Sequence, residues 1–337
     1  MRTVEFPWLR CRALAAALLW LVTPPGAAES PAEQVLAAVV DLRAQIPGDA
    51  RTAMALGLNR AGSGVVIDAD GLVLTIGYLI LEASEVMVSN HEDTFVEASI
   101  IAYDAETGFG LVRAQKPLGI EPIQLGESGV LSIGDSVLAV SGGGQTPIVA
   151  TRIVSRRTYP GYWEYLLDDA ILTAPPHPQF GGAALIDMHG QLVGIGSLII
   201  QDAAEPQSAL SGNMFVPIDA LKPVLDELVT HGRRQAPARP WLGVYTTVVR
   251  GHLMVSDVAA DGPAERAGVQ RDDIIFSVTG ERISDMADFY RKVWALGDAG
   301  VEIQIGILRA GEIKQLVVQS GDRYEWLKLS KGRKLST

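Results

Sequence analysis

The stretch GSGVVIDADGLVLT, residues 62–75, decides the fold class of this chain. Two apolar runs, Val65–Ile67 and Leu72–Leu74, flank the four residues Asp68-Ala69-Asp70-Gly71. An Asp-Gly pair between apolar runs is a strong hairpin signal, because glycine accepts the positive φ that a tight turn requires. We therefore expect two antiparallel strands here.

Similar short apolar runs, separated by Gly, Pro, Asp and Asn, continue on both sides of this hairpin. Many short strands at close spacing predict a mainly β domain, built as a barrel or a sandwich. The runs are Val86–Val88, Ser99–Ile101, Gly110–Val112, Ser136–Val140, Ala184–Ile186 and Leu192–Ile195.

A helix is expected over Ala220–His231, with Asp219 as its N-cap and Gly232 as its stop. The arginine- and proline-containing residues 233–240 then read as a solvated linker. Residues 241–323 form a smaller unit, with predicted strands at 253–255, 274–278, 301–308 and 316–318 and helices at 263–267 and 285–296. The expected domains are thus 29–232 and 241–323, followed by a tail over 324–337.

The first 28 residues have the order of a secretory signal peptide. Three arginines precede a short apolar run, Ala13–Val22, and the small residues Gly26-Ala27-Ala28 follow it. The run is too short for a membrane anchor, which needs about 20 residues. We expect cleavage near Ala28, and a periplasmic or otherwise exported chain without a stable membrane span.

Charge and residue types exclude several classes of function. The formal net charge is −11, and removal of the predicted leader, with three Arg and one Glu, makes it −13. Such an acidic protein is a poor nucleic-acid binder. Cys11 lies inside the leader, so no cysteine nucleophile remains, and the five histidines show no metal-ligand spacing. We expect no metal and no cofactor.

Four segments resemble the HtrA (DegP-like) family of trypsin-fold serine proteases with a C-terminal PDZ domain. Their order and spacing carry the resemblance, which covers roughly residues 35–323. The segments are the hairpin at 62–75, the loop HPQFGGAALID at 177–187, the run FVPID at 215–219, and the pair WLGV at 241–244 and GPAERAGV at 262–269. The resemblance implies a chymotrypsin/trypsin-like double β-barrel followed by an α+β PDZ domain.

The resemblance also implies where a catalytic triad belongs, and this chain departs from it at all three positions. Tyr78 stands where the family's hairpin ends in Thr-Asn-Asn-His. Gly108 stands at the acidic position, and Gly181 stands at the serine of Asn-Pro-Gly-Asn-Ser-Gly-Gly-Pro-Leu. Gln179 replaces a glycine of that loop, and Thr173 replaces an Asp that usually precedes it.

These departures predict loss of hydrolysis. A serine attacks only when an imidazole takes its proton and a carboxylate orients that imidazole. Glycine has no side chain to attack with, and tyrosine, with a pKa of about 10, is a poor base near pH 7. For a rebuilt nucleophile–base pair the sequence offers His177, which is close to the loop, and the hydroxyls of Ser63 and Thr75, whereas the other histidines are scattered.

The PDZ-like unit keeps more of its family's features. PDZ domains bind an extended C-terminal peptide beside an edge strand and hold its carboxylate with backbone N–H groups. Here the expected carboxylate loop is Trp241-Leu242-Gly243-Val244, followed by the pairing strand at Tyr245. Met286, Phe289 and Val293 share one helical stripe and either line the groove or belong to the core.

The expected function is a non-catalytic HtrA-like protein that binds the C-termini of peptides or unfolded proteins, or modulates an active relative by co-assembly. One alternative is a serine endopeptidase of protein quality control with an unrecognised nucleophile, and another is a purely structural remnant with no ligand.

Overall fold

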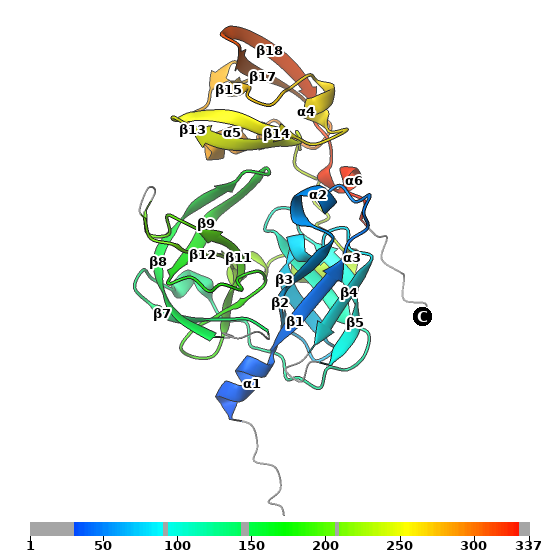
Figure 1. Cartoon of the computed structure of the whole chain (residues 1–337), viewed down its shortest axis with the longest axis vertical. Coiled ribbons are helices and arrows are strands. Elements are labelled where there is room, and N and C mark those ends of the chain that lie inside the picture. Colours follow the sequence, from blue (N-terminus) through cyan, green and yellow to red (C-terminus); the bar gives the residue numbers. More distant parts are fainter. Residues whose placement is uncertain (1–29, 90–93, 143–147, 206–208, 330–337) are drawn as a thin grey trace, which may run out of the picture.

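The fold was taken from a computed structural model that describes residues 30–89, 94–142, 148–205 and 209–329. The predicted signal peptide, residues 1–28, lies outside the described residues. Two closed six-stranded barrels lie side by side, and a separate sheet lies above them (Figure 1). The expected mainly β architecture, a double β-barrel followed by a smaller α+β unit, is confirmed.

The first barrel has the strand order β1-β2-β3-β6-β5-β4. The hairpin that decided the fold class is confirmed: Val65 pairs with Leu74, and Gly71 adopts a φ of +75° in the turn. The elements are α1 (Pro31–Ala37), β1 (Val39–Gln45), α2 (Ala53–Leu56), β2 (Asn59–Val66), β3 (Leu72–Ile76), the 3-10 helix η1 (Gly77–Leu79), β4 (Glu85–Ser89), β5 (Phe95–Tyr103) and β6 (Phe109–Ala114).

The second barrel has the strand order β10-β11-β12-β9-β8-β7. Strands β8 and β9 form a long hairpin that rises from the barrel toward the upper sheet (Figure 1). The elements are η2 (Ser128–Val130), β7 (Ser136–Val140), β8 (Ile148–Gly161), β9 (Tyr165–Ala174), β10 (Ala184–Ile186), β11 (Leu192–Ile200), β12 (Gly212–Pro217), η3 (Ile218–Ala220) and α3 (Leu225–His231).

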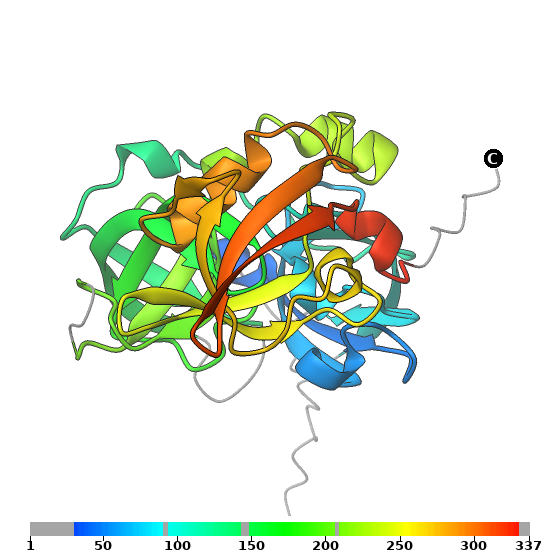
Figure 2. The ribbon, with the colours of Figure 1, turned by 90° about the horizontal axis from the view of Figure 1, so that it is seen from above.

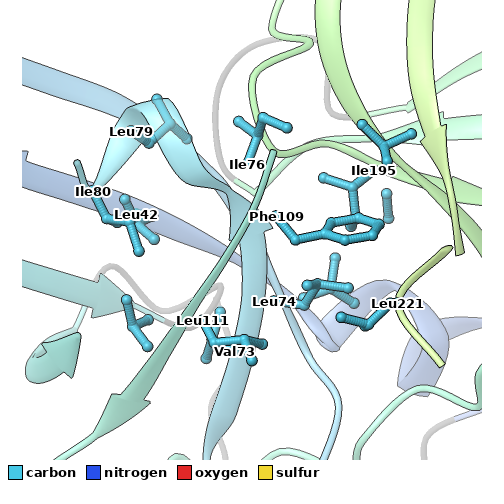
Figure 3. Close-up of a cluster of buried hydrophobic side chains, with 14 of the residues drawn as sticks. Leu42, Val73, Leu74, Ile76, Leu79, Ile80, Phe109, Leu111, Ile195 and Leu221 are labelled. Carbon is cyan, nitrogen blue, oxygen red and sulfur yellow. The ribbon is translucent and has the colours of Figure 1, made fainter. Parts of the chain in front are cut away.

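One buried apolar cluster joins the two barrels. Phe109 of the first barrel is fully buried, and Figure 3 shows its ring beside Ile195 of the second barrel. Leu74 and Leu221 complete this contact. Because burial of apolar surface is the main favourable term in folding, the barrels are expected to form one cooperative unit. Tyr78 and Gly181 meet at this junction.

The helix after the second barrel begins later than the sequence pattern predicts. The expected range was Ala220–His231, but α3 starts at Leu225. Pro223 explains the difference, because proline disfavours the helical conformation in the residue before it. The expected stop is confirmed: Gly232 has a left-handed φ of +78°, and its N–H binds the carbonyl of Leu228. Asp219 is not the N-cap; its carboxylate accepts the N–H of Gly129.

The third unit is a sheet with β13 at one edge, in the order β13-β14-β15-β17-β18. It lies over the junction of the two barrels when seen from above (Figure 2). Its elements are β13 (Val244–Val249), β14 (His252–Val258), α4 (Pro263–Arg266), β15 (Ile274–Val278), β16 (Glu281–Arg282), α5 (Met286–Trp294), β17 (Glu302–Arg309), β18 (Glu312–Gln319) and α6 (Arg323–Trp326).

The segments on both sides of this unit contact the first barrel. Arg234 was expected in a solvated linker. It forms a bidentate ion pair with the fully buried Asp104, and the Arg234 side chain is only 23% exposed. Residues 324–329 belong to the segment expected as a tail. In the structure the Tyr324 hydroxyl donates to the Tyr103 carbonyl, and the Lys328 N–H donates to Glu82. Both segments therefore attach the third unit to the barrels.

Within the parts of the chain that the structure describes, no helix has the length and apolar character of a membrane span.

Candidate functional site

Tyr78 and Gly181 lie next to each other where the two barrels meet. Tyr78 belongs to η1, directly after β3, and Gly181 lies in the loop before β10. A Cβ placed on Gly181 would lie 2.9 Å from the Tyr78 hydroxyl oxygen. The tyrosine side chain therefore occupies the space into which any side chain at position 181 would extend.

The Tyr78 hydroxyl acts as a donor in this structure. It donates a 2.9 Å hydrogen bond to the carbonyl of Ser197. Burial raises the pKa of Tyr78 well above its ordinary value. The phenol therefore keeps its proton near neutral pH and does not serve as a general base.

Gly108 completes the group of three positions. Its carbonyl accepts the N–H of Gly77, and it lines the same cavity as Tyr78. Its φ is +81°, and a Cβ there would lie 3.3 Å from the ring of Tyr165. The structure thus brings Tyr78, Gly108 and Gly181 to one place, and none of them supplies a carboxylate, an imidazole or a nucleophile.

Two amides of the loop that carries Gly181 donate to other groups of the protein. The Gln179 N–H donates to Nδ1 of the buried His177 at 3.0 Å, and the Gly182 N–H donates to the carbonyl of Gly196 at 2.9 Å. An oxyanion hole needs amides aimed at the position of the developing negative charge. These two amides are already engaged.

The residues named for a rebuilt nucleophile–base pair serve structural roles. The Ser63 hydroxyl accepts the N–H of Gly142 at 3.0 Å, and the Thr75 hydroxyl donates to the carbonyl of Ser63 at 2.7 Å. His177 accepts from Gln179 through Nδ1. In the described ranges of the chain no group of three or more His, Cys, Asp or Glu is arranged to hold a metal ion.

An apolar cavity of about 290 Å³ lies between this junction and the third unit. Tyr78 and Phe180 contribute from the barrels, Tyr162 and Trp163 from the tip of the β8–β9 hairpin, and Tyr245 from β13. The hairpin tip thus lines the cavity beside Tyr78 and also reaches the third unit.

The expected carboxylate loop of the third unit has the predicted turn. Gly243 has a φ of +78°, which only glycine adopts without strain, and a Cβ there would lie 3.2 Å from the Trp241 ring. The N–H groups of Leu242, Gly243 and Val244 all donate to one carboxylate, at 2.9, 2.6 and 2.9 Å. The loop therefore has the donor geometry that binds a carboxylate.

That carboxylate belongs to Glu164, which the sequence analysis did not identify. Glu164 lies at the tip of the β8–β9 hairpin with a φ of 57°, and it is only 7% exposed. Burial raises the pKa of Glu164 to about 7, while its three amide donors and the charge of Arg323 oppose that rise. No local sequence pattern connects position 164 with the loop 78 residues later.

The remaining predicted groove residues are buried, apart from the half-buried Tyr245. Met286, Phe289 and Val293 are buried in the core of the third unit, and their part in a peptide groove stays a prediction. Trp241 stacks obliquely on Trp326, with ring centroids 4.9 Å apart. Leu166 of β9 joins the same core cluster from the second barrel.

Comparison with known proteins finds a family match for each of the two parts of the chain. The family model of the trypsin-like peptidase domain matches residues 62–195, and that of the PDZ domain matches residues 240–319. The chain is 30% identical to a probable periplasmic serine endoprotease DegP-like from Pseudomonas putida (strain W619), over 77% of this chain and 55% of that protein. It is also 30% identical to the serine protease PepD of Mycobacterium tuberculosis, over 76% of this chain and 57% of PepD.

A solved structure agrees with these matches. A variant of the HtrA-type protease AlgW, solved with a tripeptide, superposes with a TM-score of 0.53 at 25% identity, covering 86% of this chain and 95% of AlgW. The chain spans about half the length of the curated relatives that it matches.

Proposed function

Because the chain belongs to the HtrA, or DegP-like, family of trypsin-fold serine proteases with a PDZ domain, we propose that it is a member without hydrolytic activity. In this proposal it binds the C-termini of peptides or unfolded proteins through its PDZ domain. Two features support this proposal, the residues at the barrel junction and the donor loop of the PDZ domain.

The contact between Tyr78 and Gly181 carries the first part of the proposal. Acyl transfer needs a nucleophile, a base within hydrogen-bonding reach and a donor group for the oxyanion. Here Gly181 offers no nucleophile, the Tyr78 hydroxyl donates to Ser197, and the Gln179 amide donates to His177. The nucleophile and the base are therefore missing at the positions where the family resemblance puts them, and one amide of the loop is already engaged.

The donor loop supports the second part. Three consecutive amides, Leu242 to Val244, converge on a carboxylate, as PDZ recognition of a chain end requires. The relative AlgW was solved with a tripeptide and with a decapeptide. A free C-terminal carboxylate followed inward by apolar residues is the ligand class that this loop fits.

Location and partners follow the relatives. Relatives from Pseudomonas putida and Ectopseudomonas mendocina are named probable periplasmic serine endoprotease DegP-like. We place this chain in the periplasm as well, with the leader at residues 1–28 as its export signal. An inactive chain with the same fold is suited to co-assemble with an active relative and modulate it.

We expect the purified chain to leave unfolded casein intact. We also expect no covalent labelling by a fluorophosphonate probe, because no activated serine is present at the barrel junction. An active trypsin-fold protease serves as the positive control. Turnover that persists in preparations purified to homogeneity would instead support the alternative, a serine endopeptidase with an unrecognised nucleophile.

The substitution Gly181→Ser should not create activity. The new Cβ would lie 2.9 Å from the Tyr78 hydroxyl, so the serine meets a neutral phenol instead of a base. Fluorophosphonate labelling of the variant, compared with the unmodified chain under the same conditions, checks this. Labelling of the Gly181→Ser chain at the rate of an active protease would show that a base lies elsewhere in reach.

A further inference from the structure

The carboxylate loop of the PDZ domain is occupied by the protein's own chain. All three donor amides of this loop bind the Glu164 carboxylate, and Glu164 lies on the second barrel's β8–β9 hairpin. A peptide C-terminus would need the same three amides. Glu164 and a bound chain end therefore exclude each other.

The hairpin tip also occupies the edge strand beside the loop. Strand β13 lies at the edge of its sheet, where a PDZ ligand adds as an extra strand. On that edge the Thr246 N–H donates to the Tyr162 carbonyl at 2.9 Å. The Tyr290 hydroxyl of α5 donates to the Gly161 carbonyl at 2.8 Å. The tip thus uses both the loop and the edge, as a ligand does.

The hairpin tip adopts this arrangement despite backbone strain and the desolvation of a carboxylate, which indicates a specific contact. A non-glycine residue at a φ of 57° is strained, and burial of a carboxylate is costly unless hydrogen bonds replace its water. Three charge-assisted bonds from backbone amides are the compensation. Arg323 adds a positive charge near Glu164, and its guanidinium donates to the Trp163 carbonyl.

We propose that the β8–β9 hairpin is an internal ligand of the PDZ domain, with the Glu164 carboxylate in the place of a chain terminus, and that a peptide C-terminus must displace it to bind. This inference rests on the proposed peptide-binding function and adds its regulation. Displacement would also withdraw Tyr162 and Trp163 from the cavity beside Tyr78. Peptide binding is thereby coupled to the barrel junction.

The internal ligand should weaken the apparent affinity for peptides. The apparent Kd equals the intrinsic Kd divided by the fraction of open molecules. If closed molecules outnumber open ones by about 100 to 1, the apparent Kd is about 100-fold weaker. Removal of the Glu164 carboxylate should therefore strengthen peptide binding.

Two measurements on the full chain test the proposal, and the first needs no peptide. Residue-resolved hydrogen exchange should show slow exchange at the amides of Leu242, Gly243 and Val244 in the unmodified chain. In Glu164→Ala these amides should exchange at least about tenfold faster, because their acceptor is gone. Unchanged exchange in that variant overturns the internal-ligand assignment.

The second measurement is fluorescence anisotropy with a labelled pool of decapeptides. Their last three residues are drawn from Val, Ile, Leu, Phe and Tyr, and the pool is made with a free carboxylate and as the C-terminal amide. We expect Glu164→Ala, and the size-matched Glu164→Gln, to bind the free-acid pool about tenfold or more tightly than the unmodified chain. The amide pool should bind weakly to all chains.

Asp169→Asn is the matched control. Asp169 lies on the same hairpin, but its partner is Arg156 of the hairpin itself. This variant removes one negative charge and should leave both readouts unchanged. Equal peptide affinity in the unmodified and both Glu164 chains, or equal gains in Asp169→Asn, overturns the proposal. Faster exchange without any binding of the free-acid pool keeps the internal ligand and overturns the peptide-binding function instead.

Discussion

Replacing Gly182 with alanine is expected to destabilise the protein by more than about 4 kcal/mol, which is at the extreme of single substitutions. A Cβ on Gly182 would lie 1.9 Å from the carbonyl oxygen of Ser63 and 2.7 Å from the Thr75 hydroxyl oxygen. Gly182 belongs to the second barrel, whereas Ser63 and Thr75 belong to β2 and β3 of the first. The methyl group would therefore push the two barrels apart at their junction.

Gly119→Ala is the control for this substitution. Gly119 also has a positive φ, +63°, but no heavy atom lies within 4 Å of a Cβ placed there. Its replacement should cost only about 1–2 kcal/mol, the price of a left-handed conformation for an L-residue. The thermal unfolding midpoints of the two variants separate steric overlap from backbone strain. Equal midpoints would mean that the barrels are not in the close contact described here.

Local patterns in the sequence predicted much of this fold. The hairpin at residues 62–75 followed from one Asp-Gly turn between apolar runs, and the end of α3 followed from Gly232, because these signals act over a few residues. The start of α3 was missed because the effect of Pro223 was outweighed by an apolar stripe that continues on its N-terminal side. The double barrel and the PDZ domain required the family resemblance.

The contacts between the domains were beyond such patterns. Glu164 and Leu242 are 78 residues apart, and Arg234 and Asp104 are 130 residues apart. Which acidic residue meets which donor depends on how the barrels place a hairpin tip or a linker, and no local pattern encodes that. Tyr78, Gly108 and Gly181 were different, because the resemblance already assigned them to one site, and the structure places them together.

The linker illustrates this limit of local patterns, because two adjacent arginines there have unequal roles. Arg234→Ala is expected to lower the free energy of unfolding by about 3–5 kcal/mol, since it leaves the fully buried Asp104 carboxylate without its cation. Arg233 is 48% exposed and pairs with Asp322, so Arg233→Ala should cost about 1 kcal/mol or less. Urea unfolding of the two variants, compared with the unmodified chain, measures the difference.

A second substitution identifies the cause of the Arg234 effect. If the loss comes from an unpaired buried charge, then adding Asp104→Asn to Arg234→Ala should recover part of the stability, because the neutral amide has a smaller burial cost. If the loss comes from packing of the arginine side chain, the double variant should be no more stable than Arg234→Ala alone. Recovery would show that the linker arginine stabilises the protein by neutralising Asp104, a role that its position in an arginine- and proline-containing linker does not reveal.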